Sequence, residues 1–109
     1  MFAVIYRGWL KKGKEQVYQD TWHLIARYFI EERGALGSCL HKTIDGLWIA
    51  YSRWPSKAMR DASWPGEQTP SDELPSVIKN CIEVIKDCID PERKLPDIEM
   101  EVIDDQLLQ

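Results

Sequence analysis

The dipeptide Asp45-Gly46 lies between two runs of strand-forming residues, 35–43 and 47–54. Asp-Gly is favoured in the two-residue type I′ turn, whose backbone twist matches that of the strands it joins. The pattern therefore predicts a β-hairpin. Because side chains alternate between the two faces of a strand, the length of this turn also decides which residues of the two strands share a face.

Strand and helix periodicities alternate on either side of the hairpin. Residues 2–10 are rich in aromatic and β-branched types and predict a strand, and residues 98–102 alternate apolar and acidic side chains as a half-buried strand does. Apolar residues at helical spacing mark 14–33 and 72–89 as helices. The resulting order, β-α-β-β-α-β, is that of a ferredoxin-like α+β sandwich.

A short extra helix is expected at 57–60, because Ser56 can cap it. The proline- and glycine-rich residues 65–71 predict a loop. A chain of 109 residues has room for one domain, 1–109, with a core over about 2–103 and a tail at 104–109.

Charge and cysteine content exclude several classes of protein. The net charge of −4 is the wrong sign for binding a phosphate backbone, so we expect no nucleic-acid partner. No stretch has the roughly 18 uncharged apolar residues of a membrane span, and Met1 leads into the first strand without a signal segment, so a cytoplasmic protein is expected. Cys39, Cys81 and Cys88 form no C-x-x-C pair and predict reduced, buried thiols; with two histidines, a metal site is not expected.

The predicted hairpin brings a possible site to one face. A two-residue turn pairs His41 with Ala50, Cys39 with Ser52 and Gly37 with Trp54, with Trp48 on the same face. This face is small or polar at its centre and has two indoles and an imidazole around it, which suits a cavity. A lone histidine on a strand is also commonly a surface residue, so both roles stay open for His41.

Five of the 109 residues are tryptophan, and they need a large core, an interface or a flat ligand to cover them. Both helices of a ferredoxin-like protomer lie on one face of the sheet, whereas strands 2–10 and 47–54 carry apolar residues on both faces. A second copy packing sheet to sheet is the simplest cover, so we expect a homodimer. Trp22 is expected in the core, and Trp64 at one end of the cavity or against the short helix.

Four stretches carry a resemblance to a known family: Lys12-Gly13-Lys14-Glu15, the segment 34–41, Asp45-Gly46 and Ala50-Tyr-Ser-Arg-Trp-Pro-Ser56. Over about residues 2–103 the chain resembles the antibiotic biosynthesis monooxygenase domain family, the dimeric α+β barrels. The resemblance implies a cavity between sheet and helices that takes a flat aromatic substrate. It also implies oxidation by molecular oxygen with no metal, flavin or haem cofactor.

The quinone-forming members of that family carry an Asn and a Trp on the third strand, a His on the second, a Tyr on the following helix and an Arg further on. By resemblance, Trp54 matches the Trp and His41 matches the His, while the Asn position falls on Ala50 and the Tyr position on Arg60. The haem-degrading branch uses a His after the third strand, and this chain has none beyond His41.

Two functions follow as hypotheses. In a cofactor-independent oxygenase, Trp48 and Trp54 would stack on the substrate, His41 would accept its proton, and Arg7 would stabilise the oxyanion if the odd-numbered side of its strand faces the cavity. Trp9 and Arg60 are further candidate ligand contacts, and Trp9 could instead belong to the dimer interface. The alternative is a non-catalytic barrel that binds a small hydrophobic molecule or serves as an interaction module. A purely structural role, with the indoles filling core and interface, is the third possibility.

Overall fold

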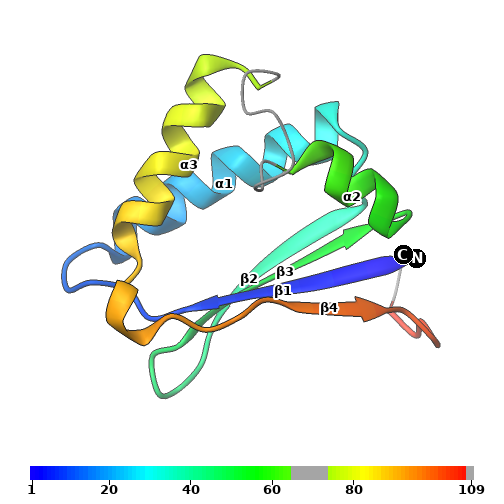
Figure 1. The fold of residues 1–109 in the computed structure, drawn as a ribbon. Coiled ribbons are helices and arrows are strands. Elements are labelled where there is room, and N and C mark those ends of the chain that lie inside the picture. Colours follow the sequence, from blue (N-terminus) through cyan, green and yellow to red (C-terminus); the bar gives the residue numbers. More distant parts are fainter. Residues whose placement is uncertain (65–73, 108–109) are drawn as a thin grey trace.

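A computed structural model describes residues 1–64 and 74–107, and it has the expected order of strands and helices (Figure 1). The elements are β1 (Phe2–Gly8), α1 (Glu15–Glu32), β2 (Gly37–Lys42), β3 (Trp48–Trp54), α2 (Lys57–Ser63), α3 (Ser76–Cys88), the 3-10 helix η2 (Pro91–Arg93) and β4 (Ile98–Glu101). The fold is therefore α+β and ferredoxin-like, as the periodicities predicted. The loop expected at 65–71 lies outside the described residues.

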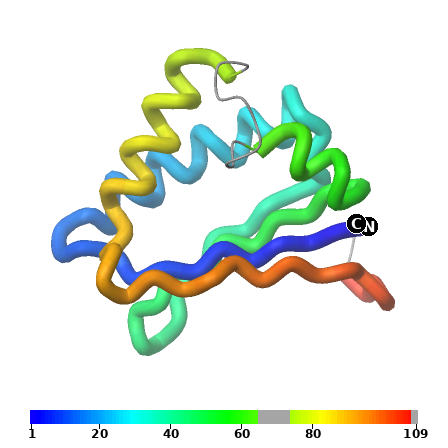
Figure 2. The backbone as a smooth tube through the Cα atoms, viewed as in Figure 1, coloured from blue at the N-terminus to red at the C-terminus, as the bar shows by residue number. Residues whose placement is uncertain are grey.

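The four strands form one antiparallel sheet in the order β2-β3-β1-β4. All three α-helices lie on the same side of this sheet (Figure 1). The tube in Figure 2 shows the first and last strands running side by side, with Phe2 opposite Glu101. The other side of the sheet carries no element of the described chain.

The turn between β2 and β3 differs from the expectation. The backbone N–H of Thr43 donates to the Leu47 carbonyl at 2.8 Å, which leaves three residues, 44–46, in the loop. Gly46 has φ +97°, whereas no described residue other than glycine has a positive φ, so Asp45 does not adopt the type I′ conformation. The N–H of Leu47 also donates to Thr43 Oγ1 at 3.0 Å, which stabilises the longer loop.

The extra loop residue shifts the strand pairing by one position. The observed pairs are Lys42 with Trp48, Leu40 with Ala50, Ser38 with Ser52, and His41 with Ile49. The expected pairing of His41 with Ala50 is therefore wrong. Because alternate side chains point to opposite faces, His41 and Cys39 lie on the face away from the helices, and Trp54 lies on the face toward them.

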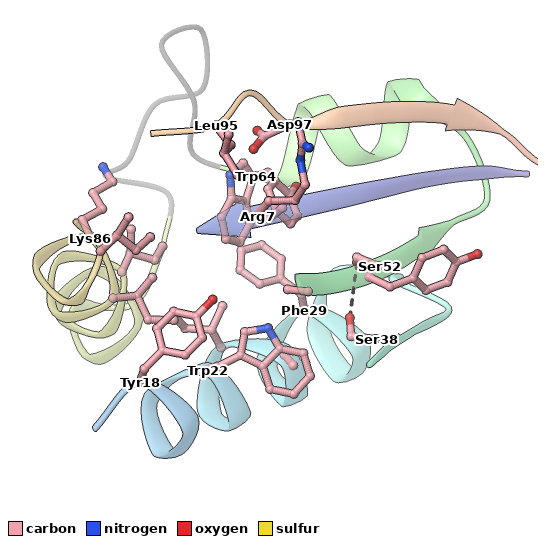
Figure 3. Close-up of a pocket in the computed structure, with 18 of the residues that line it drawn as sticks. Arg7, Tyr18, Trp22, Phe29, Ser38, Ser52, Trp64, Lys86, Leu95 and Asp97 are labelled. Carbon is pink, nitrogen blue, oxygen red and sulfur yellow. Dashed lines mark hydrogen bonds between the residues drawn. The ribbon is translucent and has the colours of Figure 1, made fainter. Parts of the chain in front are cut away.

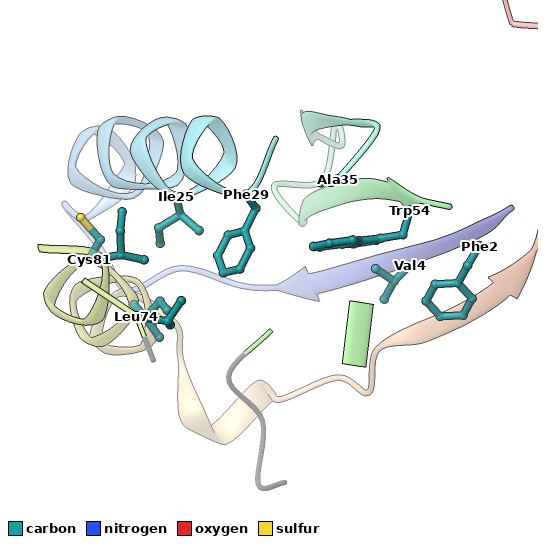
Figure 4. Packing of buried hydrophobic residues seen from close by; sticks show 10 residues of the cluster. Phe2, Val4, Ile25, Phe29, Ala35, Trp54, Leu74 and Cys81 are labelled. Atoms are coloured by element: carbon teal, nitrogen blue, oxygen red, sulfur yellow. The ribbon is translucent and has the colours of Figure 1, made fainter. Parts of the chain in front are cut away.

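Strand β1 presents its even-numbered residues to the helices, since Phe2, Val4 and Tyr6 lie opposite Trp54, Ser52 and Ala50. Val4 is fully buried, and Phe2 and Trp54 join it in a cluster with residues of α1 and α3 (Figure 4). This cluster contains Phe2, Val4, Ile25, Phe29, Ala35, Trp54, Leu74, Ile78, Cys81 and Ile82. A second buried cluster, Tyr18, Trp48 and Cys88, lies at the other end of the helices.

The cysteines are free, as expected, and Cys81 and Cys88 lie on the buried face of α3. The expectation that all three are buried is wrong for Cys39, which is exposed because the shifted pairing places it on the outer face of the sheet. Ser56 caps α2 by accepting a bond from the Met59 N–H, also as expected. None of the helices in residues 1–64 and 74–107 has the length and apolar character needed to cross a bilayer.

Candidate functional site

A cavity of about 520 Å³ lies between the sheet and the two long helices. Its size is within the range of pockets that hold small molecules. The described residues that line it are Tyr6, Arg7, Tyr18, Trp22, Ile25, Ala26, Phe29, Ser38, Ala50, Tyr51, Ser52, Trp54, Trp64, Ile82, Ile85, Lys86, Ile89, Pro91, Lys94, Leu95 and Asp97. Most of these side chains are apolar, so the cavity suits an apolar ligand.

Aromatic rings from three elements make up much of the wall. Phe29 of α1 lies 5.1 Å from Trp64 and 6.2 Å from Trp54 of β3, measured between ring centroids. Trp22 projects from α1 about two turns before Phe29 and also lines the cavity (Figure 3). Tilted and edge-on rings of this kind offer flat surfaces on which another aromatic ring can pack.

Hydroxyl-bearing side chains interrupt the apolar wall. The Ser38 hydroxyl donates to the Ser52 oxygen at 3.2 Å, so these two serines of neighbouring strands are hydrogen-bonded to each other (Figure 3). The Tyr6 oxygen accepts a bond from Arg60 Nη1 at 3.3 Å. Burial raises the pKa of Tyr6, although its bond from Arg60 opposes the rise, so the phenol stays protonated at neutral pH. Tyr18 and Tyr51 also line the cavity.

Charged groups gather where the chain returns from α3 to β4. Arg7, Lys86, Lys94 and Asp97 line this part of the cavity. Arg7 donates to the Pro96 carbonyl at 2.9 Å, while its buried Nε has no hydrogen-bond partner among the described residues. Burial raises the pKa of the Asp97 carboxyl, and the nearby Arg60, Lys94 and Arg7 oppose that rise.

Two of the six predicted site residues line the cavity. Trp54 contributes to the aromatic wall and is 2% exposed. Arg7 is at the charged end, although the odd-numbered side of β1 faces away from the helices, because its side chain reaches the carbonyl of Pro96, just before β4 begins. Trp22 was expected in the core, and Trp64 either at one end of the cavity or against the short helix; both line the cavity.

The other four predicted residues lie elsewhere. Trp48 is buried behind the cavity with Tyr18 and Cys88, and Trp9 packs under the Arg93 guanidinium at 3.9 Å. Arg60 reaches the site only through Tyr6, and it also pairs with Glu99 and Asp61. His41 is exposed on the outer face of the sheet, so its expected position beside Trp54 is wrong.

Sequence reasoning missed Tyr6 and Tyr18. Each fits the apolar pattern of its strand or helix, so the pattern predicted a core residue and gave no sign of a hydroxyl in a cavity.

Among the residues that the structure describes, no group of three or more His, Cys, Asp or Glu side chains is placed to hold a metal ion.

The chain folds like several solved structures. It superimposes on a protein from Chloroflexus aurantiacus, provisionally described as an antibiotic biosynthesis monooxygenase, with a TM-score of 0.72, 14% identity and coverage of 99% of this chain and 98% of the other. The chain has the fold of the antibiotic biosynthesis monooxygenases. A crystal structure of an antibiotic biosynthesis monooxygenase gives a TM-score of 0.68 at 14% identity, covering 95% of this chain and 100% of that one.

The antibiotic biosynthesis monooxygenase fold is also shared with Rv0793 from Mycobacterium tuberculosis, at a TM-score of 0.70, 15% identity and coverage of 97% and 98% of the two chains. No protein-family model matches the sequence, and no curated protein is significantly similar to it. At these identities the likeness establishes the fold, and activity has to be argued from the cavity itself.

Proposed function

We propose that this protein binds a small, flat, largely apolar molecule in the cavity between its sheet and helices. The observation that carries the proposal is the wall of Trp22, Phe29, Trp54 and Trp64 around a cavity of about 520 Å³. Flat aromatic molecules gain both apolar burial and favourable ring contacts in such surroundings.

Equilibrium dialysis with a tricyclic hydrocarbon such as fluorene tests this proposal. We expect saturable binding that is lost in Ala26→Phe, because Ala26 lines the cavity and a phenyl group there would occupy the ligand's space. Ala62→Phe is the matched control, since Ala62 is exposed on α2 and its phenyl group would leave the cavity open. Absence of binding to the folded protein, or equal binding to both variants, would contradict the proposal.

A second candidate is the oxidation of that ligand by molecular oxygen, which the names of the similar structures favour. In such a reaction an activated CH₂ group and O₂ give C=O and water, so one oxygen atom enters the ligand and the other leaves as water. The ligand first loses a proton, and Asp97 is the cavity carboxylate that could accept it. His41 lies on the other side of the sheet and is not assigned this step.

Oxygen uptake with an anthrone separates the two candidates. An oxygenase would consume one O₂ for each CH₂ group converted to C=O, and Asp97→Asn would slow turnover by at least about tenfold if that carboxylate is the base. Binding of the anthrone without oxygen uptake would leave only the binding function.

We further propose that two copies associate through the outer faces of their sheets. Ile5, Ile49, Ile98 and Met100 lie on that face by the observed pairing, and Ile98 is 37% exposed. An apolar sheet face that no helix covers is costly to leave in water. A second copy of the same face would cover it with twofold symmetry.

A further inference from the structure

The hydroxyl of Tyr18 is directed into the cavity and makes no hydrogen bond with any described residue. Tyr18 projects from α1, lines the cavity and is 7% exposed (Figure 3). By contrast, the hydroxyls of Tyr6 and Tyr28 accept bonds from Arg60 and Arg33. A ligand that fills the cavity displaces water from the Tyr18 oxygen, and a hydroxyl left there without an acceptor is costly, so we expect a ligand group to accept its hydrogen bond.

The surroundings of Tyr18 keep this hydroxyl neutral. Its ring packs edge-on against Trp48 at 5.6 Å and lies in one cluster with Cys88. Burial raises the pKa of Tyr18 to about 12, so the phenol carries its proton throughout the physiological range. The group therefore offers a hydrogen-bond donor to whatever occupies the cavity.

The charges around the cavity favour an electron-rich ligand atom. Among the described residues, Arg7, Lys86 and Lys94 line it, against one lining carboxylate, that of Asp97. Lys86 is 3.9 Å from Glu83, while Arg7 and Lys94 form no ion pair with any described residue. This excess of positive charge favours an oxygen that bears partial negative charge over a second hydrogen-bond donor.

We propose that Tyr18 is a specificity-determining residue, whose hydroxyl donates a hydrogen bond to the carbonyl oxygen of an aromatic ketone bound in the cavity. The inference rests on the proposed binding function and adds the chemical class of the ligand. The aromatic wall binds the rings, and Tyr18 selects molecules with a carbonyl group over hydrocarbons of the same shape.

Two probes of nearly identical shape test this: fluorenone, which has a ring C=O, and fluorene, which has CH₂ at the same position. Neither alkylates the three cysteines of the chain. By equilibrium dialysis, the wild-type protein should bind fluorenone about 3- to 10-fold more tightly than fluorene, which is the net effect of one hydrogen bond. Tyr18→Phe should bind the two probes equally, with its affinity for fluorene unchanged.

Tyr28→Phe controls for the loss of a tyrosine hydroxyl, because Tyr28 is on the same helix and does not line the cavity. It should keep the preference for fluorenone. A wild-type protein that binds fluorene but shows no such preference, or a preference that survives in Tyr18→Phe, would overturn the inference and leave the binding function intact. If the wild-type protein binds neither probe, both proposals fail.

Discussion

The ring of Trp54 lies edge-on to the ring of Phe29, with centroids 6.2 Å apart and planes at 68°. The contact joins β3 to α1, and the same two rings line the cavity and belong to the buried cluster. Stability and the shape of the site are therefore coupled at these two residues.

Trp54→Ala should lower the free energy of unfolding by about 3 to 5 kcal/mol, because it removes a large side chain from a well-packed core. Denaturation by guanidinium chloride, followed by circular dichroism, measures this loss. His23→Ala is the comparison, and it should change stability by less than about 0.5 kcal/mol, since His23 is exposed on α1 and lies away from the proposed dimer face. Equal losses in the two variants would contradict the role of Trp54 in the core.

Gly46→Ala should destabilise the protein by about 1 to 2 kcal/mol, because φ at this position is +97° and a Cβ atom disfavours that conformation. Gly37→Ala makes the same chemical change in β2 at a negative φ, with nothing within 4 Å of the new methyl group. It should be neutral or slightly stabilising. Thermal unfolding of the two variants compares them directly, and equal effects would argue against the three-residue loop.

The free energy of unfolding should fall in alkaline solution, in part because the Tyr18 phenol ionises more readily in the unfolded chain. The unfolded chain releases this proton near the ordinary pKa of 10.0, and the folded chain near about 12. Between these values the unfolded state binds fewer protons, so the free energy of unfolding decreases as pH rises. Tyr18→Phe should therefore lose about 1 kcal/mol less than the wild-type protein between pH 9 and pH 11, as measured by urea denaturation.

The proposed dimer predicts a mass near twice that of one chain, which is 12.7 kDa, in light scattering at micromolar concentration. Ile49→Lys should reduce the mass to that of the single chain, because it places a charge in the apolar outer face of the sheet. Leu24→Lys introduces the same charge on α1, where the side chain is already 53% exposed, and should leave the dimer intact. A wild-type protein with the mass of one chain would exclude the dimer.

The order of strands and helices could be predicted from the sequence because it depends on local periodicity. The helical spacing of apolar residues in α1 and α3 and the cap at Ser56 are local patterns, and the structure confirms the helices that they predict. Gly34, which follows α1 and has φ +85°, is also a local signal, because glycine adopts such a φ more readily than other residues.

The composition of the cavity could not be predicted in the same way. Asp-Gly is compatible with a two-residue loop and with the end of a three-residue loop, and the choice depends on bonds made by Thr43 and Leu47. The place of Arg60 depends on its contacts with Tyr6 and with Glu99 of β4, which are distant in sequence. Such non-local contacts leave no periodic signal.

The three-residue loop at 44–46 has a consequence for how this cavity can change in evolution. A substitution in β2 alters one side chain, whereas loss of one loop residue would rotate the whole strand and exchange Ser38 and Leu40 for Cys39 and His41 on the side of the sheet that faces the helices and the cavity. An imidazole and a thiol would then replace a hydroxyl and an isobutyl group in one genetic event. Insertions and deletions at this hairpin are therefore a direct route by which proteins of this fold could acquire or discard acid–base chemistry.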